Sequence, residues 1–226
     1  MLAEGHFLSQ GDPMTVRSRL EEVLALYSEV GNKPGIANYF YLSARLALSQ
    51  GDVITARRFS EECVRLNREL GDPNRIAFSL SVLAEVETSQ GNYSTARSLY
   101  EESLAIASKA RDKEYITFYQ EELAGVIAAQ GESVWAARLW GAAEVLREAI
   151  GAPHPPFDRV SYERSITATR ARLGEKSFAA AWAEGPTGCA TRCTSAAEVA
   201  RERALLHSED VQRGGTSLTL KAEETR

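Results

Sequence analysis

The stretch Ser49-Gln50-Gly51-Asp52 decides the fold, because close copies of it occur along the chain at one constant interval. Residues 51–90 match residues 11–50 at 14 positions, and they match residues 91–130 at 13 positions. Repetition at one fixed period indicates an array of similar structural units that stack on one another. The other copies are Ser9-Gln10-Gly11-Asp12, Ser89-Gln90-Gly91-Asn92 and Ala129-Gln130-Gly131-Glu132.

Each unit is predicted to contain two helices. Glycine suits the left-handed position that ends a helix, and Asp or Asn suits the N-cap of the next one. Asp12, Asp52 and Asn92 are therefore expected to be N-caps. A second break lies about half a period after each first one, so antiparallel helix pairs are expected. These second breaks are Gly31-Asn32, Gly71-Asp72, Arg111-Asp112 and Gly151.

Small residues recur at one position in each predicted helix. A small side chain facing a large one lets neighbouring helices approach closely and stack. Four positions after Val16, Ala56, Ala96 and Ala136 stand Leu20, Ser60, Tyr100 and Trp140, which are mostly large. The small residues are Ala56, Ala96 and Ala136, with Val16 in the first copy, and Ala44, Ala84 and Ala124 in the other helix. The expected fold class is an all-α solenoid of antiparallel helix pairs.

The period, the Leu83-Ala84 and Leu123-Ala124 pairs, and the run Gly91-Asn92-Tyr93…Ala96…Tyr100 resemble tetratricopeptide repeats. The resemblance covers about residues 1–150 and implies a right-handed TPR-like α-solenoid that binds a protein or peptide partner. A narrower resemblance joins Ala136–Glu148, Gly151-Ala152-Pro153 and Ala180–Gly185 to the C-terminal end of bacterial LuxR-type and AfsR-type regulators. It implies a place beside upstream ATPase and DNA-binding modules of a longer polypeptide.

The predicted repeat domain spans residues 1–185. It contains repeats at about 11–50, 51–90, 91–130 and 131–173, and a capping helix that ends at Gly185. Residues 2–10 resemble the second half of a repeat helix, so the chain is expected to be a fragment of a longer array. Residues 186–226 contain no aromatic residue and form a divergent tail that is expected to be partly disordered.

Composition excludes several classes of protein. The chain is 44% hydrophobic and 25% charged, with a net charge of −5, which argues against a nucleic-acid surface. No stretch approaches the roughly 20 apolar residues of a membrane span, and no secretory signal precedes the repeats. A cytoplasmic bacterial protein without direct nucleic-acid or membrane contact is therefore expected.

Catalytic, metal and cofactor sites are not expected. Cys189, Cys193 and His207 offer only three ligands, whereas structural zinc sites use four. Cys63 shares its register with Val23, Ser103 and Ala143, so a packed side chain is favoured over a nucleophile. Arg17, Arg57 and Arg97 stand at i to Glu21, Glu61 and Glu101 at i+4, a spacing that predicts ion pairs on a solvated helix face rather than paired catalytic carboxylates.

A partner-binding groove is predicted on the concave surface, which the resemblance assigns to the first helix of each pair. Aromatic, cationic and acidic groups on this face suit an extended peptide or a partner helix. The alternative is that Phe78 and Phe118 only pack between helices. The candidate groove residues are Asn38, Tyr41, Arg45, Phe78, Ser81, Glu85, Phe118 and Glu121.

Two functions remain open at this point. The first is a non-enzymatic protein–protein interaction scaffold. The second is a sensing module of a bacterial transcriptional regulator, whose groove binds a peptide or a small ligand.

Overall fold

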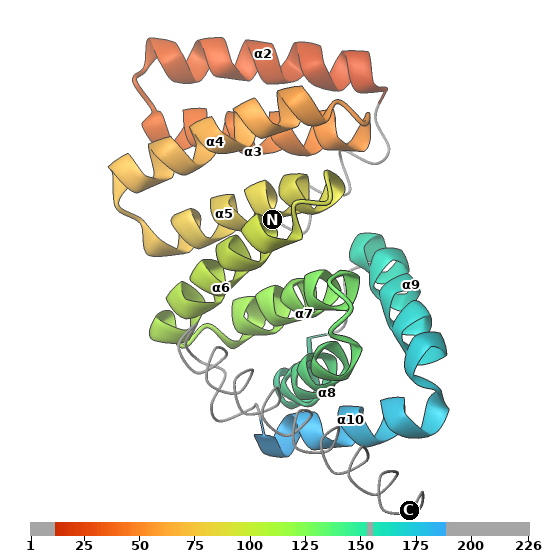
Figure 1. Ribbon diagram of the computed structural model, residues 1–226. Helices are drawn as coiled ribbons and strands as arrows, with labels where there is room; N and C mark the ends of the chain where they lie inside the picture. Colours follow the sequence, from red (N-terminus) through yellow and green to blue (C-terminus); the bar gives the residue numbers. More distant parts are fainter. Residues whose placement is uncertain (1–11, 153–155, 189–226) are drawn as a thin grey trace, which may run out of the picture.

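The computed structural model describes residues 12–152 and 156–188, and in these ranges every regular element is an α-helix. The chain winds back and forth as a stack of antiparallel helices (Figure 1). The helices are α2 (Pro13–Glu29), α3 (Lys33–Ser49), α4 (Val53–Leu70), α5 (Pro73–Ser89), α6 (Tyr93–Ala110), α7 (Lys113–Ala129), α8 (Ser133–Ile150), α9 (Pro156–Leu173) and α10 (Glu175–Gly188). This architecture confirms the all-α, TPR-like solenoid.

The helix ends lie where the repeated breaks place them. Asp12 accepts a hydrogen bond from the Thr15 backbone N–H at 3.0 Å, and Asp52 accepts one from Thr55 at 3.1 Å. Gly71 follows α4 with a φ of 71°, a left-handed conformation that glycine adopts without steric cost. Arg111 takes the same position after α6 with a φ of 54°. The N-caps expected at Asp12 and Asp52 are thus confirmed.

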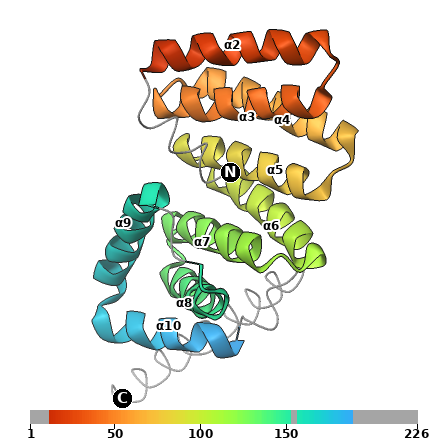
Figure 2. The same ribbon diagram turned by 180° about the vertical axis from the view of Figure 1, so that it is seen from behind.

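Among helices that follow one another in the chain, the most extensive packing joins α3 to α4, α5 to α6, and α7 to α8. These three hairpins stack in chain order, as both views show (Figures 1 and 2). A hairpin therefore begins at residue 33, 73 or 113, about half a period after the division at 11, 51 and 91 that the sequence suggested. Both divisions describe one period, because any window of that length contains one copy of each helix.

The recurrent small residues are buried between the packed helices. Ala44, Ala84 and Ala124 are 0% exposed, and so are Ala56, Ala96 and Ala136. Four positions after Ala56, Ala96 and Ala136, the side chains of Ser60, Tyr100 and Trp140 are also buried. Alternation of small and large side chains along the stack is what fills the space between helices at native density. The packing prediction is confirmed.

A repeated arginine on α2, α4 and α6 donates to a glutamine at the end of the helix that follows. Arg17 donates to the Gln50 side chain at 3.2 Å, Arg97 donates to Gln130 at 3.3 Å, and Arg57 donates to Gln90. The expected i, i+4 ion pair forms between Arg97 and Glu101, at 2.9 Å. Among the described residues, Arg17 and Arg57 have no such pair with Glu21 or Glu61 in the structure, which corrects the sequence expectation. Arg57 pairs with the Glu87 carboxylate of the next hairpin instead, and Arg17 donates to Gln50.

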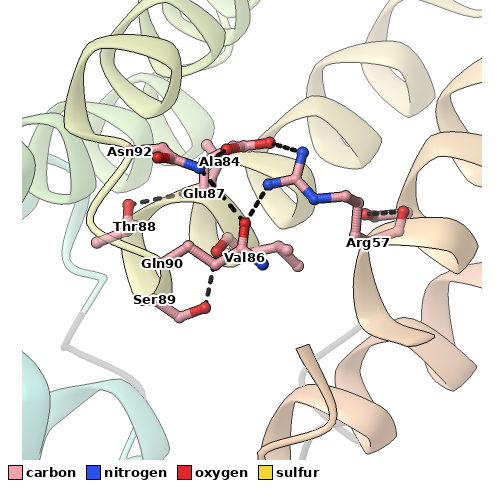
Figure 3. Close-up of polar contacts among 9 residues, drawn as sticks. Arg57, Ala84, Val86, Glu87, Thr88, Ser89, Gln90 and Asn92 are labelled. Atoms are coloured by element: carbon pink, nitrogen blue, oxygen red, sulfur yellow. Dashed lines mark hydrogen bonds and ion pairs between the residues drawn. The ribbon is translucent and has the colours of Figure 1, made fainter. Parts of the chain in front are cut away.

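Figure 3 shows this connection between α4 and α5. The Arg57 guanidinium pairs with the Glu87 carboxylate, whose side chain is 5% exposed, and the Asn92 amide donates to the same carboxylate at 2.9 Å. Asn92 makes no side-chain cap bond to α6. The N-cap expected at Asn92 is therefore only positional, because its side chain is engaged by Glu87 instead.

The last two helices depart from the stack. In both views α9 turns away from the stacking direction and α10 returns along α8 (Figures 1 and 2). An added Cβ at Gly185 would lie 2.1 Å from the Arg138 carbonyl oxygen, and one at Gly141 would lie 2.1 Å from that of Trp182. The two glycines thus allow backbone contact between α8 and α10. The sequence predicted that the last helix ends at Gly185. This prediction is wrong, since α10 runs on to Gly188.

Several predicted features lie outside the described residues, namely the partial helix at 2–10 and the part of the tail from 189 to 226. Within the described ranges, none of the helices combines the length and the apolar character that crossing a membrane requires.

Candidate partner-binding surface

The predicted groove residues lie on α3, α5 and α7, the first helices of the three hairpins. Their exposure differs, which separates residues that a partner can touch from residues that hold the array together. Tyr41, Ser81 and Glu121 are buried. The partly exposed members are Asn38, Arg45, Phe78, Glu85 and Phe118.

Arg45 and Glu85 form an ion pair across α3 and α5. The Arg45 Nη1 donates to Glu85 Oε2 at 2.6 Å, and the two side chains remain 25% and 39% exposed. A partly exposed pair contributes little to stability because water competes for both charges. It does place a guanidinium and a carboxylate in a fixed orientation on the surface.

An aromatic row runs over the same helices. The Tyr41 and Phe78 ring centroids are 4.6 Å apart, and those of Phe78 and Tyr115 are 6.4 Å apart. Tyr115 then stacks on Tyr119 at 5.8 Å. Edge-to-face and offset contacts at these distances stabilise the rings while leaving Phe78 and Tyr115 partly exposed. The row joins α3, α5 and α7 into one continuous strip.

Sequence reasoning missed Tyr115. Tyr41, Phe78 and Tyr115 are evenly spaced, but their interval is shorter than the repeat period by nearly one helical turn. Residues at the same register of successive repeats occupy equivalent places. The Tyr41 and Phe78 rings, however, each contact a ring in the next repeat that lies about one helical turn before the equivalent register. A search at this shorter interval as well as at the full period finds Tyr115.

A second missed residue is Glu122 on α7. The Tyr100 hydroxyl on α6 donates to Glu122 Oε2 at 3.3 Å. The pKa of Tyr100 is raised well above its usual value, first by burial and then by the charges of Glu122 and Glu85. Both carboxylates therefore act on one hydroxyl. With Arg45 beside Glu85, this polar centre contains one cation and two anions.

Glu121 has a structural contact set. Its carboxylate accepts from Arg147 Nε at 2.9 Å, and both side chains are nearly buried, at 5% and 12% exposed. The Trp140 indole N–H donates to the Glu121 carbonyl at 3.2 Å. These bonds fasten α7 to α8. Phe118 is partly buried beside Tyr119, with ring centroids 5.4 Å apart.

Cys63 is buried between helices and is a poor nucleophile. Its thiol donates to the Ala37 carbonyl at 3.4 Å and accepts from the Asn67 amide at 3.4 Å. Burial raises the pKa of Cys63 to about 12, so the thiolate form is disfavoured at neutral pH. Over the described residues no group of three His, Cys, Asp or Glu side chains is arranged to hold a metal ion. Cys189, Cys193 and His207 lie outside those residues.

Comparison with known families gives a match to the middle of the array. A tetratricopeptide repeat family model matches residues 36–109, which spans α3 to α6 almost completely. No curated protein matches the chain. All the candidate groove residues except Phe118 and Glu121 lie within the matched segment. The regulator-like segments from residue 136 onward lie outside the match, and that resemblance stays a prediction.

Proposed function

We propose that the chain is a non-enzymatic interaction scaffold that binds an extended protein segment along α3, α5 and α7. Tetratricopeptide repeats generally mediate protein–protein interaction, and the family match covers α3 and α5. The observation that carries the proposal is the aromatic row Tyr41–Phe78–Tyr115 lying beside the polar centre of Arg45, Glu85 and Glu122. Aromatic anchors next to a fixed charge pattern are the usual core of a binding surface.

The chemistry of the surface defines the partner. Phe78 and Tyr115 are partly exposed and suit an aliphatic or aromatic side chain of the partner. The polar centre carries an excess of one negative charge, so it favours a cationic side chain nearby. We therefore expect the bound segment to contain an apolar residue followed or preceded closely by Lys or Arg.

The test uses peptides selected from a random library against the intact chain. Their dissociation constants are measured by fluorescence anisotropy for the native protein and for the double variant Arg45→Glu with Glu85→Arg. This exchange retains an ion pair but reverses the charges that a partner meets. We expect about tenfold weaker binding or more.

A matched control lies on α4 and α6. Arg68 and Glu102 also form an exposed pair between neighbouring helices, at 3.2 Å. Exchange of these two charges should leave peptide binding unchanged. Equal loss in both double variants, or full binding by the Arg45–Glu85 exchange, contradicts the proposed surface.

A further inference from the structure

One position differs among three equivalent junctions of the array. Residues 47, 87 and 127 share one register, close to the end of α3, α5 and α7. Glu87 and Ile127 are large and fill this place, whereas the third residue is Ala47. The first junction therefore lacks the side-chain atoms that fill the other two.

A pocket of about 210 Å³ lies at the first junction, between α2, α3 and α4. Leu20, Leu46 and Ala47 form part of its lining, and the Tyr39 and Phe59 rings add aromatic surface. These two rings are 6.1 Å apart in an edge-to-face arrangement. The pocket thus has one apolar, partly aromatic wall, whereas Arg17, Ser43, Asp52 and Thr55 make the rest of its lining polar, and its volume suits only a very small organic molecule.

A guanidinium lines the same pocket with room for an acid. In the second junction Arg57 binds the Glu87 carboxylate, and in the third Arg97 binds Glu132 at 3.1 Å. Arg17, the equivalent residue of the first junction, donates to Gln50 at 3.2 Å. Among the residues that the structure describes, Arg17 has no carboxylate at ion-pair distance. Ala47 stands where the acid of the second junction would be.

We propose that this pocket binds a small carboxylate with a flat apolar body. The carboxylate takes the place that the Glu87 side chain fills one repeat later and binds Arg17. The apolar body lies against Leu20, Leu46 and the Phe59 ring. Guanidinium and carboxylate geometries match as paired N–H donors and oxygen acceptors, which gives this contact its specificity.

Four charged side chains surround the pocket, Arg17 among them. Asp52 and Glu21 also line it, together with Arg58. Asp52 shares its register with Glu132 and accepts from the Thr55 backbone N–H at 3.1 Å. The pKa of its carboxyl is lowered, first by the hydrogen bonds from Thr55 and then by the charges of Arg17 and Arg58. Arg58 lies over the Phe59 ring, with its guanidinium carbon 5.3 Å from the ring centroid. Two cations and two anions make the rim neutral, so binding of a carboxylate depends on its direct contact with Arg17 and not on the net charge of the pocket.

Benzoate is the probe, and benzamide is its uncharged counterpart of nearly equal shape. Binding of each to the intact chain is measured by calorimetric titration and by amide shifts in NMR spectra. We expect saturable binding of benzoate, with shifts grouped at residues 16–20, 43–50 and 55–59. Benzamide should bind about tenfold more weakly or worse.

Three variants make the test specific to Arg17 and Ala47. Ala47→Glu supplies an internal carboxylate and should abolish benzoate binding. Arg17→Gln removes the guanidinium at an exposed position, so it should fold normally and also lose binding. Glu87→Ala should create a second benzoate site beside Arg57, because it makes the second junction resemble the first.

The outcomes separate clearly. Equal binding of benzoate and benzamide, no saturable binding of benzoate, or unchanged binding by Arg17→Gln each overturns the proposal. Circular dichroism shows whether each variant is folded, and a misfolded Ala47→Glu leaves Arg17→Gln as the deciding variant. The site is independent of the peptide surface on α3, α5 and α7, so the Arg45–Glu85 charge exchange should leave benzoate binding intact.

Discussion

The junction of α2, α3 and α4 and the junction of α4, α5 and α6 are built from the same parts but differ in one buried charge. Both have the arginine that donates to a turn glutamine, through Arg17–Gln50 and Arg57–Gln90. At Glu87 the second junction adds a buried carboxylate, whereas Ala47 leaves a pocket in the first. The repeated residues therefore determine how the helices stack. The side chain at position 47 or 87 determines whether the space at each junction is filled by the chain itself.

The largest effect is expected from Glu87→Ala. The carboxylate is almost buried and binds both Arg57 and Asn92, so its loss leaves each of these donors with Gln90 as its remaining acceptor. Arg57 is one third exposed, and water can therefore replace part of the lost contact. We expect the free energy of unfolding to fall by about 2–3 kcal/mol, measured by urea denaturation. Glu87→Gln, which keeps the volume and an acceptor, should lose about half as much. A loss below about 0.5 kcal/mol in Glu87→Ala would mean that the second junction does not depend on this acid.

The reverse change at the first junction, Ala47→Glu, is expected to stabilise the chain. The pocket of about 210 Å³ can accommodate the added atoms, and the new carboxylate lies near Arg17. A gain of about 1 kcal/mol in urea denaturation is expected, since Arg17 is exposed and the pair is only partly shielded. Ala47→Leu is the volume control. If Leu stabilises as much as Glu, the gain comes from filling space and no pair with Arg17 has formed.

The turn glutamines should matter less. Gln50→Ala and Gln90→Ala each remove one acceptor of a charged donor, and we expect losses of about 0.5–1 kcal/mol by the same measurement. Gln90→Ala should be the larger of the two, because Asn92 also donates to Gln90, at 3.4 Å. A larger loss of unfolding free energy for Gln50→Ala than for Gln90→Ala would contradict this prediction.

The smallest effect is expected where the two junctions are already alike. The Cys63 thiol donates to the Ala37 carbonyl at 3.4 Å, and the Ser103 hydroxyl donates to the Ala77 carbonyl at 2.9 Å, at the same separation along the chain. Cys63→Ser should therefore change the free energy of unfolding at neutral pH by about 0.5 kcal/mol or less.

Cys63 also gives a pH dependence with a defined sign. The folded-state pKa is raised to about 12 by burial, above that of an exposed thiol. The thiol's contribution is therefore fully present below the unfolded pKa and is lost as pH rises toward the folded pKa. At about pH 10 the native chain should have lost about 1 kcal/mol more than Cys63→Ser. Parallel curves for the two proteins would show that the thiol ionises in the folded state.

Sequence reasoning predicted the fold and most of the helix ends, because most helix ends depend on neighbouring residues such as Gly71 and Asp72. It missed contacts between helices. An Arg–Glu pair at i and i+4 can be recognised within one helix, but the bond from Arg57 to Gln90 requires the position of the next helix. Gly185 was assigned to a helix end for the same reason, since its close contact with α8 is not a local property. For the surface, the register of the repeat found Phe78, whereas Tyr115 follows the shorter interval at which neighbouring rings touch.

The most direct test of the account is amide hydrogen exchange on the double variant Ala47→Glu with Glu87→Ala. Exchange reports the stability of each helix end separately. If the junctions are equivalent and the acid alone distinguishes them, protection should rise at residues 46–50 at the end of α3. It should fall at residues 86–90 at the end of α5, while α7 and α8 remain unchanged. Unchanged exchange at both ends, or a loss of protection along the whole array, would contradict the account.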